Sequence, residues 1–420
     1  MSDKIQIQVN SEIGDLEAVI LHAPGVEIEN MTPETAERAL YSDILNLTVA
    51  TNEYAQLSGV LNKICKTFEV QDLLQTVLAD EKIKTDIINK VCTNENVLDI
   101  RNYLLSLSNT ELAKQFIEGV PMKKDNLTKY LQKEKYSLQP LHNFFFTRDA
   151  SMTVRDKVLI GRMANNVRKR EALIMEAIFM HHPDFVVNET VNPENCYDCK
   201  PELTVEGGDF LVARNDVFLI GNGARTSTNG VDFLIEELKK RKLKRHLIVQ
   251  ELPHNPESFI HLDMIFTFID KNKCMVYEPI ILKQNRYQTI HIEIDNGEVK
   301  SIKNVENIPQ VLRKLGIDLE PVLCGGKNEW IQEREQWHSG ANFFAVGPGK
   351  VIGYERNVHT IGELNKAGME VIKAEDVISG KINLNDYQKY VVTIEGSELA
   401  RGGGGARCMT MPVRRKEVSW

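Results

Sequence analysis

Long apolar runs are missing from this chain of 420 residues, and so is any excess of positive charge. No stretch approaches the roughly 18 apolar residues of a membrane helix, and the polar start at 1–10 lacks the basic and apolar parts of a signal peptide. The net charge of -8 offers no basic field to a nucleic acid. We therefore expect a cytoplasmic protein that binds neither membranes nor nucleic acids.

Cysteine is scarce and irregularly spaced, with seven residues scattered over the chain. An odd number in this arrangement does not suggest a disulfide framework, so reduced thiols are expected. The single Cys-x-x-Cys pair, Cys196 and Cys199, lies in loop-like sequence without a second pair or a nearby His, which is weak evidence for zinc. We expect no metal there.

An internal repeat of strand, strand, helix and strand organises most of the chain. Two clear units span 152–187 and 210–249, a third spans 342–372, and weaker partners lie at 264–281 and 16–29. A small odd number of such units closes most naturally into a ring. The predicted fold is therefore α/β, a five-unit ββαβ pseudo-symmetric propeller, with its chemistry at the centre.

One segment, 72–139, breaks the repeat because its apolar residues follow helical spacing with little strand signal. It is predicted to be an all-helical insertion. The catalytic propeller would then comprise 1–71 and 140–420. The composition of the whole chain, 42% hydrophobic and 26% charged, is that of an ordinary folded protein.

Carboxylates recur at equivalent places in the repeat. Asp149 and Glu206 are 57 positions apart, and so are Glu206 and Asp263. The repeat therefore predicts that the three converge, either on a metal or on a cationic substrate, because buried negative charge without a partner is costly.

Two further features accompany these carboxylates. The period of a strand would point His261 and Asp263 to one face, although a lone His-x-Asp is more often a structural pair than a catalytic one. Gly207 and Gly208 would let the backbone come close to a ligand beside Asp209.

Cys408 follows four consecutive glycines, a run that neither a helix nor a strand interior favours. A phosphate-binding loop is excluded because no Lys-Ser or Lys-Thr follows the glycines. On cysteine statistics alone an inert buried thiol would be the better hypothesis. With Arg407 beside it and His261 as a candidate partner, a nucleophilic thiol of lowered pKa becomes physically sensible.

Together these motifs resemble the arginine deiminase family, within the guanidino-group-modifying superfamily, over essentially the whole chain. The matching segments are Glu12-Ile13-Gly14, LHAPG at 21–25, FTRD at 146–149, EGGD at 206–209, HLDM at 261–264, QEREQW at 332–337, GYERN at 353–357 and RCMTMP at 407–412. The resemblance implies hydrolysis of L-arginine to L-citrulline and ammonia without a cofactor or metal.

The resemblance also assigns roles. Cys408 would attack the guanidinium carbon to form an amidino-thioether, and His261 would protonate the leaving ammonia and then activate water. Asp149 and Asp263 would grip the guanidinium nitrogens, and Glu206 would be the remaining catalytic carboxylate. The expected substrate-binding set is Asn143, Phe146, Arg168, Arg225 and Asp209, with the arginines holding the substrate carboxylate.

Three positions depart from the family pattern. Gly403 replaces an arginine linked to gating and to the environment of the thiol, Ala224 replaces an acidic residue, and Ser42 replaces one Asp of a common pair. Gating, affinity and pH optimum could differ as a result.

Other hypotheses stay open. The same scaffold could serve an agmatine or methylarginine hydrolase or an amidinotransferase, and a cage without turnover would give a binding protein. A metal-dependent hydrolase using Glu206, Asp209, His261 and Asp263 would make the thiol irrelevant. A homo-oligomer is also expected.

Overall fold

The structure is a computed structural model that describes residues 4–36, 41, 43–196 and 200–420. Ser42 and Cys199, two positions discussed above, lie outside those ranges. Of the helices in the described part, none combines the length and apolar character needed to cross a membrane.

Five sheets among the described residues share one pairing pattern. In each, two strands pair antiparallel, and one of them also pairs in parallel with a third strand. The strands are β6 (Ser151–Val154), β7 (Lys157–Ile160) and β9 (Glu189–Val191); β10 (Phe210–Arg214), β11 (Val217–Asn222) and β12 (Arg245–Glu251); β13 (Phe266–Asp270), β14 (Lys273–Val276) and β17 (Glu320–Leu323); β18 (Phe344–Gly347), β19 (Lys350–Tyr354) and β21 (Tyr390–Ile394); and β22 (Met411–Arg415), β2 (Leu16–Leu21) and β3 (Lys66–Glu69). The last set joins the two ends of the chain in one sheet.

Helices connect the strands, and three further strands widen two of these sheets. The helices outside the 72–139 segment are α1 (Val26–Glu29), α2 (Pro33–Ala36), α3 (Leu47–Ile64), α9 (Lys169–His181), α10 (Thr228–Lys239), α11 (Glu278–Ile281), α12 (Ile308–Lys314), α13 (Glu329–Trp337), α14 (Val358–Lys366) and α15 (Ala374–Ile378). β15 (Thr289–Asp295) and β16 (Glu298–Val305) extend the sheet of β10, and β20 (Glu370–Lys373) extends the sheet of β18.

Two strands of the predicted repeat are placed differently. The 185–187 segment was expected to close the first unit, but β8 (Phe185–Val186) pairs with β1 (Ile5–Gln6), where the Phe185 ring contacts Phe68, and β9 pairs with β7 instead. In the third unit, β21 lies between β19 and β20. All five residues of β21 are buried, as suits the interior of a sheet with parallel neighbours.

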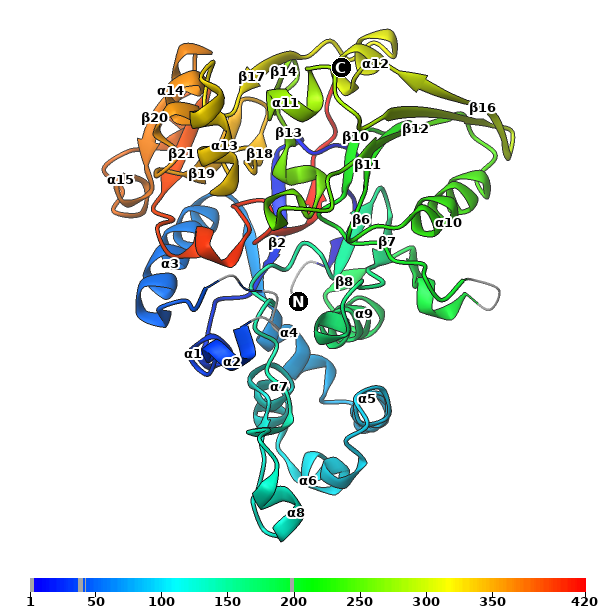
Figure 1. Cartoon of the computed structure of the whole chain (residues 1–420), viewed down its shortest axis with the longest axis vertical. Helices are drawn as coiled ribbons and strands as arrows, with labels where there is room; N and C mark the ends of the chain where they lie inside the picture. Colours follow the sequence, from blue (N-terminus) through cyan, green and yellow to red (C-terminus); the bar gives the residue numbers. More distant parts are fainter. Residues whose placement is uncertain (1–3, 37–40, 42, 197–199) are drawn as a thin grey trace.

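The 72–139 segment forms the narrow lower end of the molecule in Figure 1. Its helices are α4 (Val70–Val77), which begins before the predicted start at 72, α5 (Glu81–Asn94), α6 (Arg101–Ser106), α7 (Asn109–Glu118) and α8 (Leu127–Leu131). The segment is not all helical, because β4 (Val120–Pro121) pairs with β5 (Tyr136–Leu138). Ser108 and Glu111 form a capping box that fixes the start of α7.

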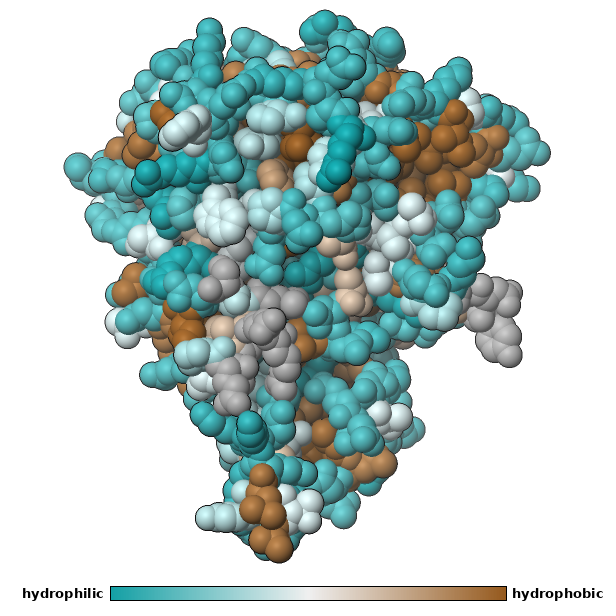
Figure 2. Space-filling view, viewed as in Figure 1, coloured by the Kyte–Doolittle hydropathy of each residue, from teal (hydrophilic) through white to brown (hydrophobic). Residues whose placement is uncertain are grey.

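A shared core docks this segment on the rest of the molecule. Ile88 of α5 and Phe116 of α7 belong to the same buried cluster as Val158 of β7 and Ile178 of α9. The far tip is less well covered, and Figure 2 shows an apolar patch there, over α8.

Loops that precede the first strand of each sheet carry the polar residues of interest. Asp149 precedes β6, Glu206 precedes β10, Asp263 precedes β13, Asn342 precedes β18 and Cys408 precedes β22. Equivalent loops of the five sheets therefore supply one residue each.

Candidate active site

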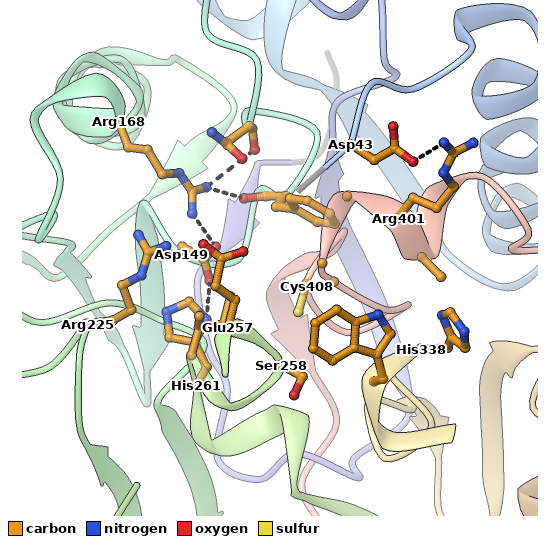
Figure 3. Close-up of a pocket in the computed structure, with 18 residues that line it drawn as sticks. Asp43, Asp149, Arg168, Arg225, Glu257, Ser258, His261, His338, Arg401 and Cys408 are labelled. Carbon is orange, nitrogen blue, oxygen red and sulfur yellow. Dashed lines mark hydrogen bonds and ion pairs between the residues drawn. The ribbon is translucent and has the colours of Figure 1, made fainter. Parts of the chain in front are cut away.

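A cavity of about 220 Å³ contains most of the predicted site residues (Figure 3). The predicted residues that line it are Asn143, Phe146, Asp149, Arg168, Arg225, His261 and Cys408. Glu206, Asp209 and Asp263 do not line it, and all three are fully buried next to residues that do. The structure therefore brings the predicted residues together, with one group lining the cavity and the other directly behind it.

Asn342 holds the loop that carries Cys408. Its Oδ1 accepts hydrogen bonds from the backbone N–H groups of Arg407 at 2.9 Å and Cys408 at 3.2 Å. Its Nδ2 lies 3.2 Å from the Cys408 Sγ and donates to the Asp263 carbonyl at 3.1 Å. One amide side chain therefore fixes the thiol relative to Asp263.

Arg407 is almost completely buried and fully engaged. Its guanidinium donates to both oxygens of Glu12 at 3.1 Å, to Asp263 Oδ2 at 2.8 Å and to the Phe210 carbonyl at 2.9 Å. Burial alone would raise the pKa of Glu12, but the ion pair with Arg407 lowers it to about 2. The cation of Arg407 is thus balanced by two carboxylates.

The thiol of Cys408 differs from the sequence-based prediction. Its Sγ lies 3.7 Å from Asp263 Oδ2, and burial together with the carboxylates of Asp263 and Asp149 raises the pKa of the thiol well above its ordinary value. The cation of Arg407 lowers the pKa of the thiol, but its effect is smaller because Glu12 and Asp263 already neutralise this cation. The expected lowering of the thiol pKa is wrong for this structure.

His261 lies between two carboxylates. Its Nε2 is 3.0 Å from Glu206 Oε2, and its Nδ1 is 3.6 Å from Asp149 Oδ1. Burial would lower the pKa of His261, but Asp149 and the hydrogen bond to Glu206 raise it to about 9. The imidazole is therefore a cation at neutral pH, and this charge lowers the pKa of Glu206 to about 2 against the effect of burial.

The backbone around His261 is not the predicted strand. His261 is extended, but Leu262–Met264 form a 3-10 turn, with Leu262 buried in the core. Asp209 fixes this turn by accepting the Leu262 N–H at 2.9 Å, and burial raises the pKa of Asp209 to about 7. Asp209, expected among the substrate-binding residues, thus lies behind the cavity wall.

The two glycines before Asp209 make room for protein rather than for a ligand. A Cβ at Gly208 would lie 2.4 Å from the His261 Nδ1, and one at Gly207 would lie 2.1 Å from the Arg148 carbonyl oxygen. Both positions therefore require glycine for the His261 ring and the FTRD loop to approach.

The two predicted carboxylate-binding arginines differ in availability. Arg168 donates to Asp149 Oδ2 at 2.6 Å and to Glu171 at 2.7 Å, so its fork of donors is occupied. Within the described part of the chain, the Arg225 guanidinium has one ionic contact, to Glu206 at 4.0 Å. Asp149 Oδ1 has no hydrogen-bond partner among the described residues.

A group of three residues has the spacing of a cation site. Ligand atoms of Asp149, Glu206 and His261 lie within 4.8 Å of one another. Asp209 and Asp263, which belonged to the metal alternative considered above, are not part of this group.

Several cavity or supporting residues escaped sequence analysis. Asn342 could have been found because it holds the position in its unit that Asp149 and Cys408 hold in theirs. Glu12 lies in a matched motif, but its distance of 395 positions from Arg407 hides the ion pair. Glu257 lines the cavity without any signal in the repeat. Trp337, also in the lining, ends the matched QEREQW segment but was given no role.

Comparison with solved structures identifies the class of this fold. The N-terminal domain of ArgZ, an arginine dihydrolase from cyanobacteria, superimposes with a TM-score of 0.53 and 14% identity, covering 96% of this chain and 98% of that one. The amidinotransferase SxtG from Microseira wollei gives a TM-score of 0.53 at 12% identity, covering 99% and 98%. The chain has the mixed α/β fold of guanidino-group-modifying enzymes.

The sequence comparisons are more specific. The arginine deiminase family model matches residues 37–415. The arginine deiminase of Bacillus cereus is 32% identical over 437 residues, covering 99% of this chain and 100% of that protein, and that of Listeria monocytogenes is 33% identical, covering 98% of each. The chain belongs to the arginine deiminase family.

Proposed function

We propose that this protein hydrolyses L-arginine to L-citrulline and ammonia through a covalent adduct on Cys408. The observation that carries the proposal is the placement of the Cys408 thiol in one cavity with Asp149 and the cationic His261, 3.7 Å from Asp263. Arginine deiminases are hydrolases of C–N bonds in linear amidines, and this geometry suits that reaction.

The substrate guanidinium would lie between Asp149 and Asp263. Asp149 Oδ1 has no hydrogen-bond partner among the described residues, although it lies 3.6 Å from the His261 Nδ1. A cation between the two carboxylates offsets the charge that keeps the thiol protonated. Substrate binding thus lowers the pKa of Cys408, and the thiol proton leaves to solvent because His261 already carries one.

The thiolate then attacks the guanidinium carbon and forms a C–S bond. His261 donates its proton to the departing nitrogen, the C–N bond breaks and ammonia leaves, which gives an amidino-thioether. The neutral imidazole next takes a proton from water, whose oxygen attacks the same carbon. The C–S bond then breaks, the second proton of that water leaves to solvent, and the ureido product, the thiolate and the imidazolium result.

The amino-acid end of the substrate would bind at Arg225, Asn143 and Arg168. Because Arg168 holds Asp149 here, full binding requires the Arg168–Asp149 contact to give way to a substrate carboxylate. Breaking this single ion pair would free Asp149 to bind the substrate guanidinium and Arg168 to bind the substrate carboxylate. Phe146 would form the wall, and Asp209 would act only through the Leu262 turn.

Two alternatives fit less well. A metal on Asp149, Glu206 and His261 would have to displace the proton of His261, whose pKa the neighbouring carboxylates raise to about 9. Agmatine hydrolysis would leave Arg225 without a carboxylate to bind. Another guanidino substrate or an amidinotransferase reaction remains the second candidate, since the same thiol and carboxylates would serve it.

We further propose that the five sheets close into a pseudo-symmetric propeller of 1–71 and 140–420, with 72–139 as an insertion. The shared pairing and the convergence of five equivalent loops support this arrangement. A cytoplasmic location is proposed because five cysteines among the described residues are free; Cys196, contrary to the expectation of reduced thiols, is disulfide-bonded. The expected homo-oligomer can be checked by analytical ultracentrifugation.

The decisive experiment is identification of products by mass spectrometry after incubation with L-arginine, agmatine and methylated arginines in parallel. We expect citrulline from arginine, and an adduct on Cys408 in quenched reactions. Cys408→Ala should lower turnover by about 10⁴-fold or more without unfolding the protein. Cys65→Ala, which removes a thiol outside the cavity, is the matched control. Normal turnover by Cys408→Ala, or loss of activity with a chelator, would contradict the mechanism.

A further inference from the structure

The cavity has an acidic residue at its exposed end that the proposed mechanism does not use. Glu257 is the first residue of a 3-10 turn (Glu257–Phe259), is exposed and lines the cavity with Arg225 and Cys408 (Figure 3). Among the described residues its carboxylate has neither a hydrogen bond nor an ion pair. The other acidic lining residue at the cavity mouth, Asp43, is by contrast paired with Arg401.

The charges of a free amino acid give an unpaired carboxylate in this cavity a role. Its α-carbon carries a carboxylate and an ammonium together, so the partner of the ammonium must lie near the partner of the carboxylate. Asp149 in this cavity is reserved for the guanidinium, and Arg225, which lines the same cavity 4.0 Å from Glu206, supplies a cation for the carboxylate. Glu257 is the lining carboxylate that is free to supply an anion there.

We propose that Glu257 binds the α-ammonium of the substrate and so restricts the enzyme to arginine with a free amino group, a claim that rests on the proposed function. Residues within a polypeptide lack this charge, so they are excluded by chemistry as well as by size. Because Glu257 is exposed, solvent screens the contact, and it contributes to substrate binding rather than to the chemical step.

The test compares two ligands that differ only at this group, L-arginine and 5-guanidinopentanoate, which lacks the α-amino group. Calorimetry on the Cys408→Ala background measures binding without dependence on turnover. We expect Glu257→Gln to weaken L-arginine binding about 5- to 20-fold and to leave 5-guanidinopentanoate within twofold. Glu257→Asp should lie between the parent and Glu257→Gln.

Kinetics on the otherwise unchanged enzyme supply a second readout. Glu257→Gln should raise KM for L-arginine with kcat nearly unchanged. Glu81→Gln, which removes an exposed acid at the start of α5, should change neither quantity. Equal weakening of both ligands would mean a general field effect, and no weakening of either would mean a solvated acid; both outcomes overturn the proposal. Failure of the parent enzyme to produce citrulline would instead refute the proposed function.

Discussion

Two arginines bracket the loop that carries Cys408, and their surroundings are opposite. The Arg407 side chain is 2% exposed and pairs with Asp263, whose side chain is fully buried. The Arg401 side chain is 39% exposed and pairs with Asp43, whose side chain is 54% exposed. A buried ion pair tolerates no missing partner, whereas an exposed pair is screened by water and salt.

This contrast divides the loop into a fixed end and an adjustable end. At the fixed end, Arg407 holds Asp263 beside the thiol while Asn342 holds the loop backbone. At the adjustable end, Gly402, Gly403 and Gly404 line the cavity beside an exposed ion pair. The Arg407 end of this short segment thus holds the reacting groups in place, and the glycine end borders the access to them.

The largest effect is expected from breaking the fixed end. Arg407→Gln leaves the carboxylates of Glu12 and Asp263 buried without their cation, and should lower the free energy of unfolding by about 3–5 kcal/mol. Urea denaturation measures this loss, and Arg401→Gln is the matched control. An unfolding midpoint equal to that of the parent protein would show that the two ends do not differ.

The contributions of His261 and Glu12 to the free energy of unfolding depend on pH in opposite directions. The folded pKa of His261 is raised to about 9 from 6.5, so its contribution to stability is complete below pH 6.5 and is lost as pH rises through 9. The folded pKa of Glu12 is lowered to about 2 from 4.5, so its contribution is present above pH 4.5 and is lost as pH falls through 2.

Activity should follow His261, because the leaving nitrogen needs its proton. We expect kcat to fall about tenfold per pH unit above 9. A pH–rate profile on L-arginine checks this expectation, with stability measured separately over the same range. A kcat that keeps rising beyond pH 10 would contradict the role of His261 as a proton donor.

Sequence analysis could predict the repeat and the convergence of its carboxylates because both follow from local spacing. Of these carboxylates, set 57 positions apart, Asp149 lines the cavity, while Glu206 and Asp263 lie directly behind the lining residues His261 and Cys408. Sequence analysis could not predict the pKa of the Cys408 thiol, because the charge of Arg407 is cancelled by Glu12 from the other end of the chain. The β21 strand was likewise missed, since only tertiary packing inserts it between β19 and β20.

A smaller effect is expected from adding charge at the adjustable end. Gly403 has a φ of 84°, and no atom of the described residues lies within 4 Å of the place that a Cβ would take, so an arginine fits there with some backbone strain. Gly403→Arg should lower the pKa of Cys408 and speed alkylation of the thiol by about threefold at pH 8. Gly403→Gln carries the strain without the charge, so equal alkylation rates in the two variants would exclude an electrostatic role.

The smallest effect is expected from the exposed pair of Arg401 and Asp43. Water and dissolved ions already solvate both groups, so removing either one leaves no buried charge behind. Arg401→Gln and Asp43→Asn should each leave the urea midpoint unchanged and alter KM for L-arginine by less than about threefold at 0.15 M salt. Because the pair lies at the cavity mouth, the change in KM should grow at low ionic strength and disappear at about 1 M salt.

The double variant measures the coupling directly, since a pair that acts only through its mutual contact makes the second substitution silent after the first. A large loss of turnover in either single variant, unchanged by salt, would show that this end of the loop is as fixed as the end held by Arg407.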